Sequence, residues 1–338
     1  MAIGWGIIGI GRYADNIIAP AISRATNTKF VAVCSRSMQR AQDFASKYAV
    51  EHAYDSLEKM LEDPELDVLY VVTPHSLHAQ QTIQAAEAGK HVLCEKPMAL
   101  TVADAELMIQ ACNRNKVKLG VCFNGRYHPA HMEAHRYIPS GIVGDISVAT
   151  ARYFRPLFSW QGWRGDPDIG GGGAIMAQAL HCIDILRYLL DSEVTEVRSL
   201  TDIEPPHRPV DDMVYAILKF DNGARGVVIA GIVVPRSENG VVLYGRKAKI
   251  ICDETIGSTD DSLGELLVDG DSLNVRMTFP TDEPKLIRNI RAVEAFNTWV
   301  EGNSEKYLSD DYNGLQMVRI TNAIMESSCQ GRAITIMR

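Results

Sequence analysis

The 338-residue sequence lacks the features of several classes of protein. Basic residues are not in excess: 34 Lys and Arg stand against 42 Asp and Glu, a net charge of −8. This balance disfavours nucleic acid or an anionic membrane as the main partner, because phosphate recognition needs clustered cations. Repeats and low-complexity segments are also absent. The 46% of hydrophobic residues and the length instead predict a globular protein of about two domains.

Paired cysteines and a long apolar run are also absent. The seven cysteines are scattered and form no Cys-x-x-Cys pair, so we expect no disulfide framework and no metal site, and a reducing cytoplasmic location. The N-terminus has no basic leader, and the apolar run at residues 3–10 is too short to span a membrane. His128, His131 and His135 have helical spacing, but we interpret them as an exposed polar face.

Residues 1–122 alternate short apolar runs with helical patterns. The runs lie near 3–8, 29–34, 68–72, 91–94 and 117–122, and the helical patterns near 14–25, 37–48, 76–88 and 101–115. Strands buried on both faces and joined by crossover helices have this pattern. We therefore predict an α/β fold with a doubly wound parallel sheet of the Rossmann type in a dinucleotide-binding domain, residues 1–122.

The first expected strand ends in the turn Gly9-Ile10-Gly11-Arg12-Tyr13-Ala14. Gly9 permits a tight turn, Gly11 lets the backbone approach a pyrophosphate, and Ala14 takes the third glycine's place. The helix that follows offers free N–H groups to the phosphates. An ordinary strand-to-helix turn is the alternative.

The second expected strand ends at Ser35 and Arg36, with Arg40 one helical turn further on. An NAD-selective site usually has an acidic residue here for the ribose 2′-hydroxyl, whereas a hydroxyl and guanidinium groups suit a 2′-phosphate. We therefore predict NADP in preference to NAD. The alternative is that Arg36 is solvated or stacks on adenine while either cofactor binds.

Two further turns follow expected strands, Thr73-Pro74-His75-Ser76-Leu77-His78 and Glu95-Lys96-Pro97. Open α/β sheets bind ligands at such strand ends, and Lys96 can donate to a substrate oxygen there. The alternatives are an ion pair of Lys96 with Glu95 or Asp104 and, for His78, packing. The residues that we expect to contact the cofactor are Gly9, Gly11, Arg12, Tyr13, Ser35, Arg36, Arg40, Thr73, Pro74, His75, His78, Glu95 and Lys96.

Residues 123–338 form the expected second domain, which binds substrate and mediates oligomerisation. Residues 156–173 are rich in aromatic, charged and glycine residues, among them Phe158, Trp160, Trp163 and Arg164. Sugars bind to aromatic faces and polar rims, so we expect this loop to cover the substrate. The acids of Val210-Asp211-Asp212 either approach the cleft or cap a strand.

The helix expected at 174–190 is apolar on most sides and carries His181 and Asp184 on one face. His181 is our candidate for proton transfer, although a histidine on a buried helix is often a core residue. Asp184 either binds substrate, orients His181, or pairs with Arg187.

Strand patterns near 146–155, 193–202, 211–220, 224–234, 238–245 and 247–252 predict a large, open, mainly antiparallel sheet, with Asp221-Asn222-Gly223 as a hairpin turn. Its outer face carries Val227, Ile229, Ile232 and Val234 and would form an interaction surface.

These motifs resemble the Gfo/Idh/MocA family of oxidoreductases over nearly the whole chain. The resemblance depends on V-V-T-P-H-S-L-H (71–78), A-G-K-H-V-L-C-E-K-P (88–97) and G-G-G-A-I-M-A-Q-A-L-H-C-I-D (171–184). It implies a Rossmann domain, a C-terminal α/β domain with a large sheet, and homodimers or homotetramers formed through that sheet. It also implies roles for Lys96 and His181. The segment Gln161-Gly162-Trp163-Arg164 is similar to the anhydrofructose reductase and xylose dehydrogenase branch.

One position departs from this family. Many members carry Asp four residues before the histidine, where this chain has Ala177, followed by Gln178. Either Gln178, Asp184 or a loop residue such as Trp163 or Arg164 then supplies the substrate contact, or the chemistry differs.

The sequence predicts hydride transfer between a nicotinamide and a carbohydrate-like substrate, namely a sugar, polyol or related hydroxy or keto compound. His181 would exchange the hydroxyl proton and Lys96 would stabilise negative charge on the same oxygen. The alternatives are a nicotinamide-dependent glycosidase and a non-catalytic nucleotide-binding regulator.

Overall fold

The computed structural model describes residues 2–157, 159–203, 209–257, 264–271, 273–279, 284–302 and 307–337. Phe158, part of the expected substrate loop, lies outside them. The chain folds into two compact units, Met1–Asn124 with Lys285–Val318 and Gly125–Pro284 with Arg319–Arg338. The domain division expected from the sequence places Lys285–Val318 in the second domain instead.

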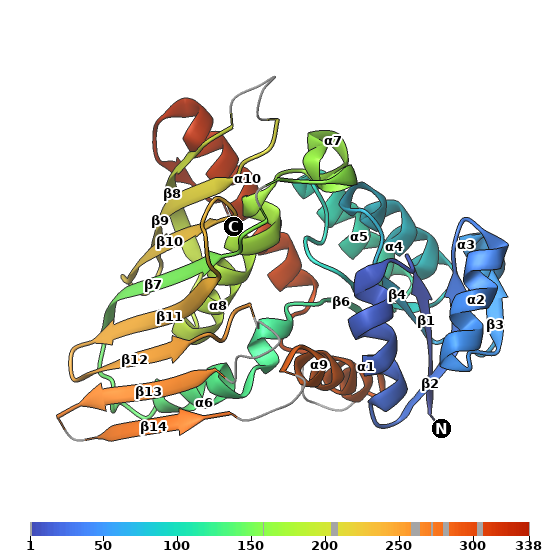
Figure 1. Cartoon of the computed structure of the whole chain (residues 1–338), viewed down its shortest axis with the longest axis horizontal. Coiled ribbons are helices and arrows are strands. Elements are labelled where there is room, and N and C mark those ends of the chain that lie inside the picture. The colour runs from blue at the N-terminus through green and yellow to red at the C-terminus, as the bar shows by residue number, and fades with distance from the viewer. Residues whose placement is uncertain are drawn as a thin grey trace. The chain divides into compact units, whose positions relative to one another are not determined.

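Six parallel strands form the sheet of the first unit, in the order β3-β2-β1-β4-β5-β6 (Figure 1). This is the classic strand order of dinucleotide-binding sheets, with its switch point between β1 and β4. Every residue of β1 and β4 is buried, as expected for continuous apolar runs. The strands are β1 (Ile3–Ile8), β2 (Thr28–Cys34), β3 (His52–Tyr54), β4 (Val68–Val71), β5 (His91–Cys94) and β6 (Leu119–Val121).

Helices connect these strands near the expected positions. A π-helical turn, η1 (Ala14–Ile18), leads into α1 (Ala19–Arg24), and α2 (Met38–Tyr48), η2 (His75–Leu77), α4 (His78–Glu87) and α5 (Val102–Arg114) follow. Thr101 caps α5, because its Oγ1 accepts a hydrogen bond from the Asp104 N–H at 3.1 Å. The short elements β3 and α3 (Leu57–Leu61) were not predicted.

The returning segment of the first unit packs against β1 and β6. Trp5 Nε1 donates to Asn297 Oδ1 of α9 (Pro284–Val300) at 2.9 Å, and the Trp5 ring meets Phe296 edge-on. The Val121 N–H donates to the Ser309 carbonyl at 2.8 Å, just before α10 (Asp311–Gln330). Fully buried contacts of this kind explain why the segment belongs to this unit.

The second unit contains a nine-stranded sheet in the order β14-β13-β12-β11-β7-β10-β9-β8-β15. Its pairs are antiparallel except β7 with β10, which are parallel, so the predicted mainly antiparallel sheet is confirmed. The strands are β7 (Ile146–Phe154), β8 (Val194–Thr201), β9 (Met213–Phe220), β10 (Arg225–Gly231), β11 (Glu238–Gly245), β12 (Ala248–Asp253), β13 (Glu265–Gly270), β14 (Asn274–Thr278) and β15 (Ile334–Thr335).

Helices cover one face of this sheet. The π-helical turn η5 (Ile175–Ala179) and α8 (Leu180–Leu190) lie against the central strands, and α6 (Pro129–Tyr137) lies against β12 and β13. The remaining short helices are η3 (Asn124–Tyr127), η4 (Gly162–Gly165) and α7 (Pro167–Gly170). Within the described residues, Pro167–Leu190 is the stretch long and apolar enough to cross a membrane, but 78% of its apolar window is buried, as in a core helix.

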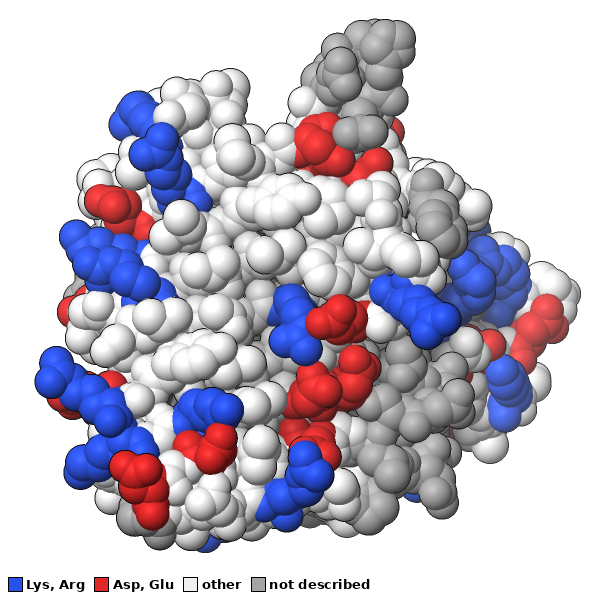
Figure 2. Space-filling view, turned by 60° about the vertical axis from the view of Figure 1, so that its left-hand side comes forward, with Lys and Arg blue, Asp and Glu red and all other residues white. Residues whose placement is uncertain are grey.

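The opposite face of the sheet exposes apolar side chains. Leu200, Tyr215 and Ile217 are 66%, 47% and 55% exposed, and Val227 and Ile229 are half-buried beside them. Seen from this side, a broad uncharged area lies between groups of basic and acidic residues (Figure 2). The prediction is wrong for Ile232, which is fully buried. We call the exposed apolar side chains of β7–β11 on this side the outer sheet face.

Candidate functional site

The glycine turn after β1 has the geometry that a dinucleotide requires. Gly9 has φ +98°, and a Cβ there would lie 2.6 Å from the Val72 carbonyl group of the neighbouring strand end. A Cβ at Gly11 would meet no atom within 4 Å, so backbone at Gly11 faces open space. The helix that starts at Ala14 follows directly. These residues fit the pyrophosphate of a nicotinamide dinucleotide, which agrees with the sequence prediction.

Helix α2 presents its N-terminus beside the end of β2. Ser37 caps it by accepting a hydrogen bond from the Arg40 N–H, and Ser35 and the exposed Arg36 precede the cap. Arg40 reaches back and donates through Nη2 to the Ile10 carbonyl oxygen at 3.4 Å. The structure therefore gathers Ser35, Arg36 and Arg40 around one helix start, and Arg40 links that helix to the glycine turn.

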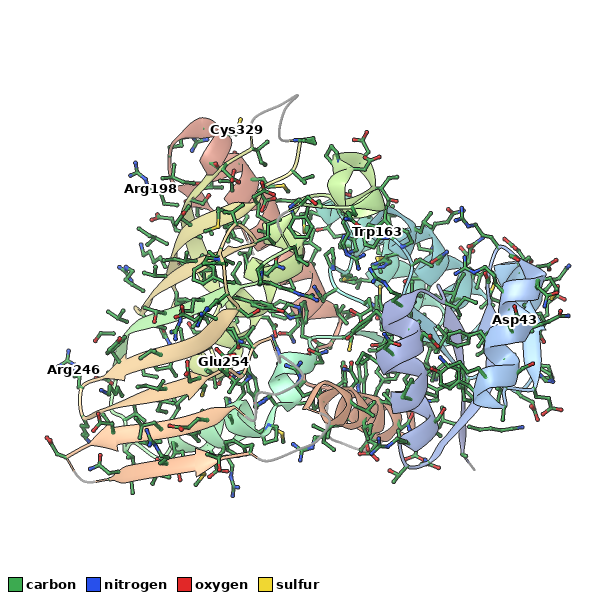
Figure 3. All side chains as sticks on the ribbon, viewed as in Figure 1. Asp43, Trp163, Arg198, Arg246, Glu254 and Cys329 are labelled. Atoms are coloured by element: carbon green, nitrogen blue, oxygen red, sulfur yellow. The ribbon has the colours of Figure 1, made fainter. Side chains whose placement is uncertain are left out.

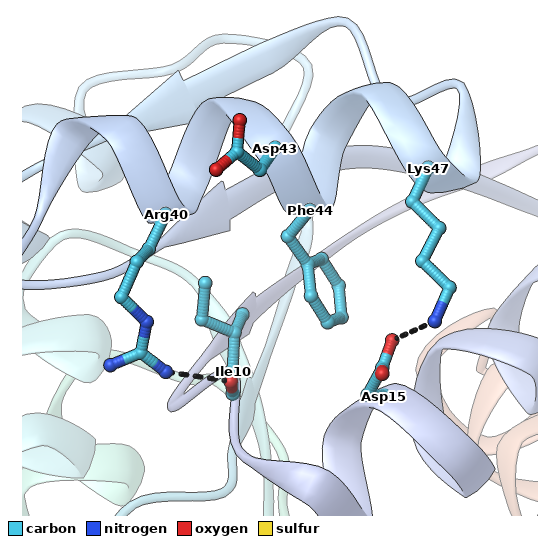
Figure 4. A pocket seen from close by; sticks show the side chains of 6 residues that line it. All are labelled: Ile10, Asp15, Arg40, Asp43, Phe44 and Lys47. Carbon is cyan, nitrogen blue, oxygen red and sulfur yellow. Dashed lines mark hydrogen bonds and ion pairs between the residues drawn. The ribbon is translucent and has the colours of Figure 1, made fainter.

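A hollow of about 240 Å³ lies between α2 and the glycine turn (Figure 4). Arg40 bounds it at one end, and the ion pair of Lys47 with Asp15, at 2.6 Å, closes the other. Its lining residues are Ile10, Asp15, Arg40, Asp43, Phe44 and Lys47.

The strand ends of β4 and β5 are tied together by His78. This residue is fully buried, and its Nδ1 and Nε2 lie 2.8 and 2.9 Å from the carbonyl oxygens of Pro97 and Thr73. Both nitrogens are therefore engaged by backbone, and no polar atom of His78 is left for a cofactor. Burial lowers the pKa of the His78 imidazole. The packing alternative fits His78, and Thr73, Pro74 and His75 are half-buried at the same strand end.

Lys96 is half-buried and follows Glu95, whose carboxylate points inward. Tyr70 donates through its hydroxyl to Glu95 Oε1 at 3.0 Å, and the Lys96 N–H donates to Glu95 Oε2 at 3.3 Å. Burial raises the pKa of the Glu95 carboxyl, and the Lys96 charge opposes this shift. Glu95 thus supports the backbone that presents Lys96, rather than facing the open turn itself.

Tyr13 joins the glycine turn to the interior of the first unit. Its side chain is 37% exposed, yet its hydroxyl accepts a hydrogen bond from the buried Asn124 Nδ2 at 3.3 Å. Asn124 also donates to Asn289 Oδ1 at 3.3 Å. Burial of the hydroxyl, with the nearby Glu95 charge, raises the pKa of Tyr13 well above its usual value. The exposed Arg12 and the ring of Tyr13 remain at the turn surface.

In the second unit, η5 and α8 carry one accessible stripe. Ala177, His181 and Tyr188 are half-buried, whereas most of the other side chains of this helix are buried. Ala177 lies one turn before His181 on this stripe, so a methyl group stands where many family members would place a carboxylate. The ring of Tyr153 from β7 lies 6.2 Å from the His181 ring and forms a wall beside it. Sequence reasoning did not single out Tyr153.

Asp184 and Gln178 lie away from this stripe. Arg126 donates to both carboxylate oxygens of Asp184, with Nη2 2.6 Å from Oδ1, and both residues are buried. Arg187 Nη1 is 3.9 Å from the same carboxylate. Asp184 therefore acts in a buried ion-pair network, mainly with Arg126, which the sequence did not suggest. Gln178 is 2% exposed, and its Oε1 has no hydrogen-bond partner within the described part of the chain. In this structure neither side chain is placed to meet a substrate.

The expected substrate loop holds two short helices. Trp160 Nε1 donates to the Asp211 carbonyl at 3.1 Å, and the Arg164 guanidinium stacks over the Trp163 ring at 4.3 Å. Both residues belong to η4, and Trp163 is labelled in Figure 3. The loop that follows β12, from Glu254 to Gly257, is held by Asn239, whose Oδ1 accepts the Ile256 N–H at 2.7 Å.

The histidines of α6 were interpreted wrongly. His128 and His131 are buried, not exposed. The ring nitrogens of His131 lie 2.8 Å from the Gly125 carbonyl oxygen and 2.8 Å from Thr255 Oγ1. His135 stacks on Tyr188 with ring centroids 4.5 Å apart.

A separate group of Glu51, His52 and Glu65 lies within metal-binding distance among the described residues. The Lys29 ammonium is 2.9 Å from Glu65 and 4.0 Å from Glu51, so it already supplies positive charge there.

Two family models match this chain. The model of the oxidoreductase family with an NAD-binding Rossmann fold matches residues 3–123, and that of the GFO/IDH/MocA C-terminal domain matches residues 131–251. The chain belongs to the Gfo/Idh/MocA family. The resemblance drawn from the sequence motifs is thus confirmed.

Members of the Gfo/Idh/MocA family with named activities match nearly the whole chain. The 1,5-anhydro-D-fructose reductase of Ensifer adhaerens is 28% identical, over 98% of both chains. D-xylose 1-dehydrogenase (NADP(+)) 2 of Haloferax volcanii is 28% identical, over 98% of this chain and 99% of that one. A levoglucosan dehydrogenase solved with NADH is 25% identical, with a TM-score of 0.85 and 99% coverage of both chains. The protein is an NAD(P)-dependent oxidoreductase of this family.

Proposed function

We propose that this enzyme transfers a hydride between a nicotinamide cofactor and a carbon bearing a hydroxyl or keto group in a sugar or polyol. The named relatives act on carbohydrates, which supports this substrate class. The observation that carries the proposal is that His181 places an accessible imidazole on a helix whose charged residues, Asp184 and Arg187, are buried and paired with other side chains.

In this proposal two side chains act on the substrate oxygen. His181 takes the proton of the substrate hydroxyl during oxidation and returns it during reduction. Lys96 donates a hydrogen bond to the same oxygen and stabilises its developing negative charge. The nicotinamide, when bound, carries the hydride.

The test is a spectrophotometric panel of aldoses, polyols and keto-sugars with each nicotinamide in both directions. His181→Ala and Lys96→Ala should each lower kcat by about 10²–10⁴-fold, the usual contribution of a positioned proton-transfer group. Lys59→Ala is the matched control, since Lys59 is exposed and pairs with Asp55 at 3.0 Å. Unchanged turnover in both site variants would refute the assignment.

Two other functions are distinguished by the same panel. A glycosidase that uses its nicotinamide transiently would retain cofactor and show no net reduction of it, but would cleave glycosides. A non-catalytic regulator would bind cofactor and turn over nothing. Stoichiometric accumulation of the reduced cofactor excludes both as the main activity.

We infer further that NADP is preferred. Ser35, Arg36 and Arg40 supply a hydroxyl and two guanidinium groups at the capped start of α2, and β2 ends without the carboxylate that an NAD site uses. Arg36→Ala and Arg40→Ala should each raise the dissociation constant of NADPH by about tenfold, the equivalent of one charge-assisted hydrogen bond. The dissociation constant of NADH should stay nearly unchanged. Equal dissociation constants for the two cofactors in the native enzyme would contradict this preference.

We also propose that the outer sheet face pairs two or four copies of the chain, in the cytoplasm. Exposed Leu200, Tyr215 and Ile217 form an apolar surface larger than scattered residues would give. Light scattering should show a dimer or tetramer, and Ile217→Glu should shift it toward monomer. A native monomer at micromolar concentration would refute the proposal.

A further inference from the structure

Asp211 lies at the point where β9 begins and is fully buried. Its carboxylate caps the segment that leads into the His181 helix. Oδ1 accepts a hydrogen bond from the Gly173 N–H at 2.8 Å, and Oδ2 accepts one from the Ile175 N–H at 2.7 Å. The capping acid is thus more than thirty residues away in sequence, so the fold itself places it here.

The backbone of Asp211 makes two further contacts to the same region. Its carbonyl oxygen accepts from the Ala174 N–H at 2.9 Å and from Trp160 Nε1 at 3.1 Å. Trp160 belongs to the candidate substrate loop, and Ala174 begins the helical segment. One residue therefore ties the loop and the helix to the sheet.

The glycines before the helix allow Asp211 and Trp160 to approach its backbone closely. A Cβ at Gly173 would lie 2.0 Å from the Asp211 carbonyl oxygen and 2.6 Å from Trp160 Nε1, so any side chain there would displace backbone. A Cβ at Gly172 would lie 3.3 Å from Asp211 Oδ1. The sequence motif that precedes His181 thus has a packing partner, and that partner is Asp211.

The capped segment continues without a break to His181. The π-helical turn η5 runs from Ile175 to Ala179, and α8 follows at Leu180. Six residues separate Ile175 from His181, which corresponds to about 9 Å along a helix axis. A shift of the first turn would therefore move His181. Ala177, on the same stripe, has no polar group that could hold the substrate in place.

We propose that Asp211 is a positioning residue, whose carboxylate fixes the helix that presents His181 and whose carbonyl fixes the substrate loop through Trp160. This inference rests on the proposed role of His181. Asp211 touches neither substrate nor cofactor in this arrangement. It determines the position of the His181 helix and of the substrate loop.

Charge gives this role a pH dependence. Burial raises the pKa of Asp211 to about 6, the N–H groups of Gly173 and Ile175 oppose that shift, and the nearby Asp202 carboxylate adds to it. The indole of Trp160, which also packs here, is neutral. Because this pKa lies above that of a solvated carboxyl, protonation below pH 6 favours the buried, capped state over an opened one. Opening of the capped segment should therefore become easier as the pH rises through about 6.

The experiment compares Asp211→Asn with Asp145→Asn, a control at a highly exposed residue whose carboxylate is 3.9 Å from Arg246 Nε. The asparagine variant keeps one acceptor oxygen and turns an NH₂ group toward the second N–H. We expect kcat to fall by up to about 100-fold, the scale of a small displacement of a catalytic group, with the cofactor dissociation constant within twofold of native. Hydrogen exchange of peptides covering residues 171–181 should accelerate, and the difference in their protection between pH 5 and pH 7.5 should disappear.

Native hydrogen exchange at pH 5 and pH 7.5, corrected for intrinsic rates, needs no variant and decides the matter if Asp211→Asn does not fold. Lower protection of residues 171–181 at pH 7.5 than at pH 5 supports the proposal, and equal protection overturns it. An Asp211→Asn enzyme that matches Asp145→Asn in kcat and exchange also overturns it. If His181→Ala keeps full turnover, the proposed function fails instead, and the exchange data still report on the cap.

Discussion

The parallel sheet of the first unit buries both of its faces, whereas the mixed sheet of the second unit buries one. In β4 every residue is buried, and in β9 the pattern alternates between buried and exposed from Val214 onward. Crossover helices force the first pattern, because each parallel connection lays a helix on a face. Antiparallel strands joined by hairpins place no helix on the sheet, so the second sheet can leave one face exposed.

The two units also hold their buried acids differently. Asp63, in the first unit, accepts from the Glu65 N–H, His52 and the Tyr54 hydroxyl, at 2.9, 2.6 and 3.1 Å. Burial alone would raise the pKa of Asp63, but these three contacts lower it. The Asp211 carboxylate accepts from the Gly173 and Ile175 N–H groups, no side chain among the described residues donates to that carboxylate, and burial raises its pKa. Hydrogen bonds outweigh burial at Asp63, whereas burial outweighs them at Asp211.

The largest expected effect concerns the segment that returns to the first unit. Trp5→Ala should lower the free energy of unfolding by about 3–5 kcal/mol, because it empties a fully buried site against Tyr70 and Phe296 and leaves Asn297 without its indole donor. Chemical denaturation measures this. Trp5→Phe is the milder control. A loss below 1 kcal/mol would mean that α9 is not held by this contact.

In the second unit, Arg126→Met should cost about 3 kcal/mol, since it leaves the buried Asp184 carboxylate with Arg187 alone at 3.9 Å. The double variant Arg126→Met with Asp184→Leu should recover much of the loss, because no unpaired charge then remains. Urea unfolding of the two variants gives both values. A double variant less stable than the single one would show that the attraction between Arg126 and Asp184, rather than the avoidance of an unpaired buried charge, stabilises the helix.

Two neighbours on β9 test the one-sided burial of the second sheet. Leu218→Ala should cost about 2–4 kcal/mol, because this side chain is fully buried. Ile217→Ala, one residue earlier and 55% exposed, should cost below about 1 kcal/mol in the monomer. Denaturation at low protein concentration measures both. Equal costs would mean that the outer sheet face is covered even in the monomer.

The smallest expected effect is the difference between Asp63 and Asp211 in how their contribution to the free energy of unfolding changes with pH. Asp63→Asn should cost about 1–3 kcal/mol at neutral pH, the scale of hydrogen bonds to a charged group. The folded pKa of Asp63 is depressed, so this difference is present above about pH 4 and disappears as the pH falls through the folded value. Unfolding free energies measured between pH 3 and 8 show it.

Asp211→Asn should show the opposite trend. The folded pKa of Asp211, about 6, lies above its unfolded value, so the native protein loses stability relative to this variant as the pH rises from 4 to 6. Parallel pH curves for the two variants would contradict the assigned shifts.

Much of the fold could be read from local patterns. Continuous Val, Ile and Leu runs indicated β1, β2, β4 and β5, and alternation indicated β7 to β12. The strand β3 was missed because its three residues, His52-Ala53-Tyr54, are half-buried and show no period. The hairpin of β13 and β14 was missed because charged and apolar residues mix along it, as in Asn274–Thr278, where no residue is fully buried.

The candidate site was read less completely. Gly9, Gly11, Ser35, Arg36 and Lys96 lie at strand or helix ends, as their motifs predicted. Asp184, Gln178 and His78 were expected to contact ligands and are buried among protein groups instead. Arg126 and Asp211 were missed as partners, although the glycine run at 171–173 signalled that some group must approach closely there.

The sequence by itself determined the α/β class, the glycine turn, the lysine and histidine motifs and the family, because each depends on neighbours a few residues apart. Only the tertiary structure decided which polar residues stay accessible. Burial, and the choice of Arg126 for Asp184 or of Gly173 and Ile175 for Asp211, depend on contacts between segments 36 to 58 residues apart. Those contacts form only when the sheet brings the segments together.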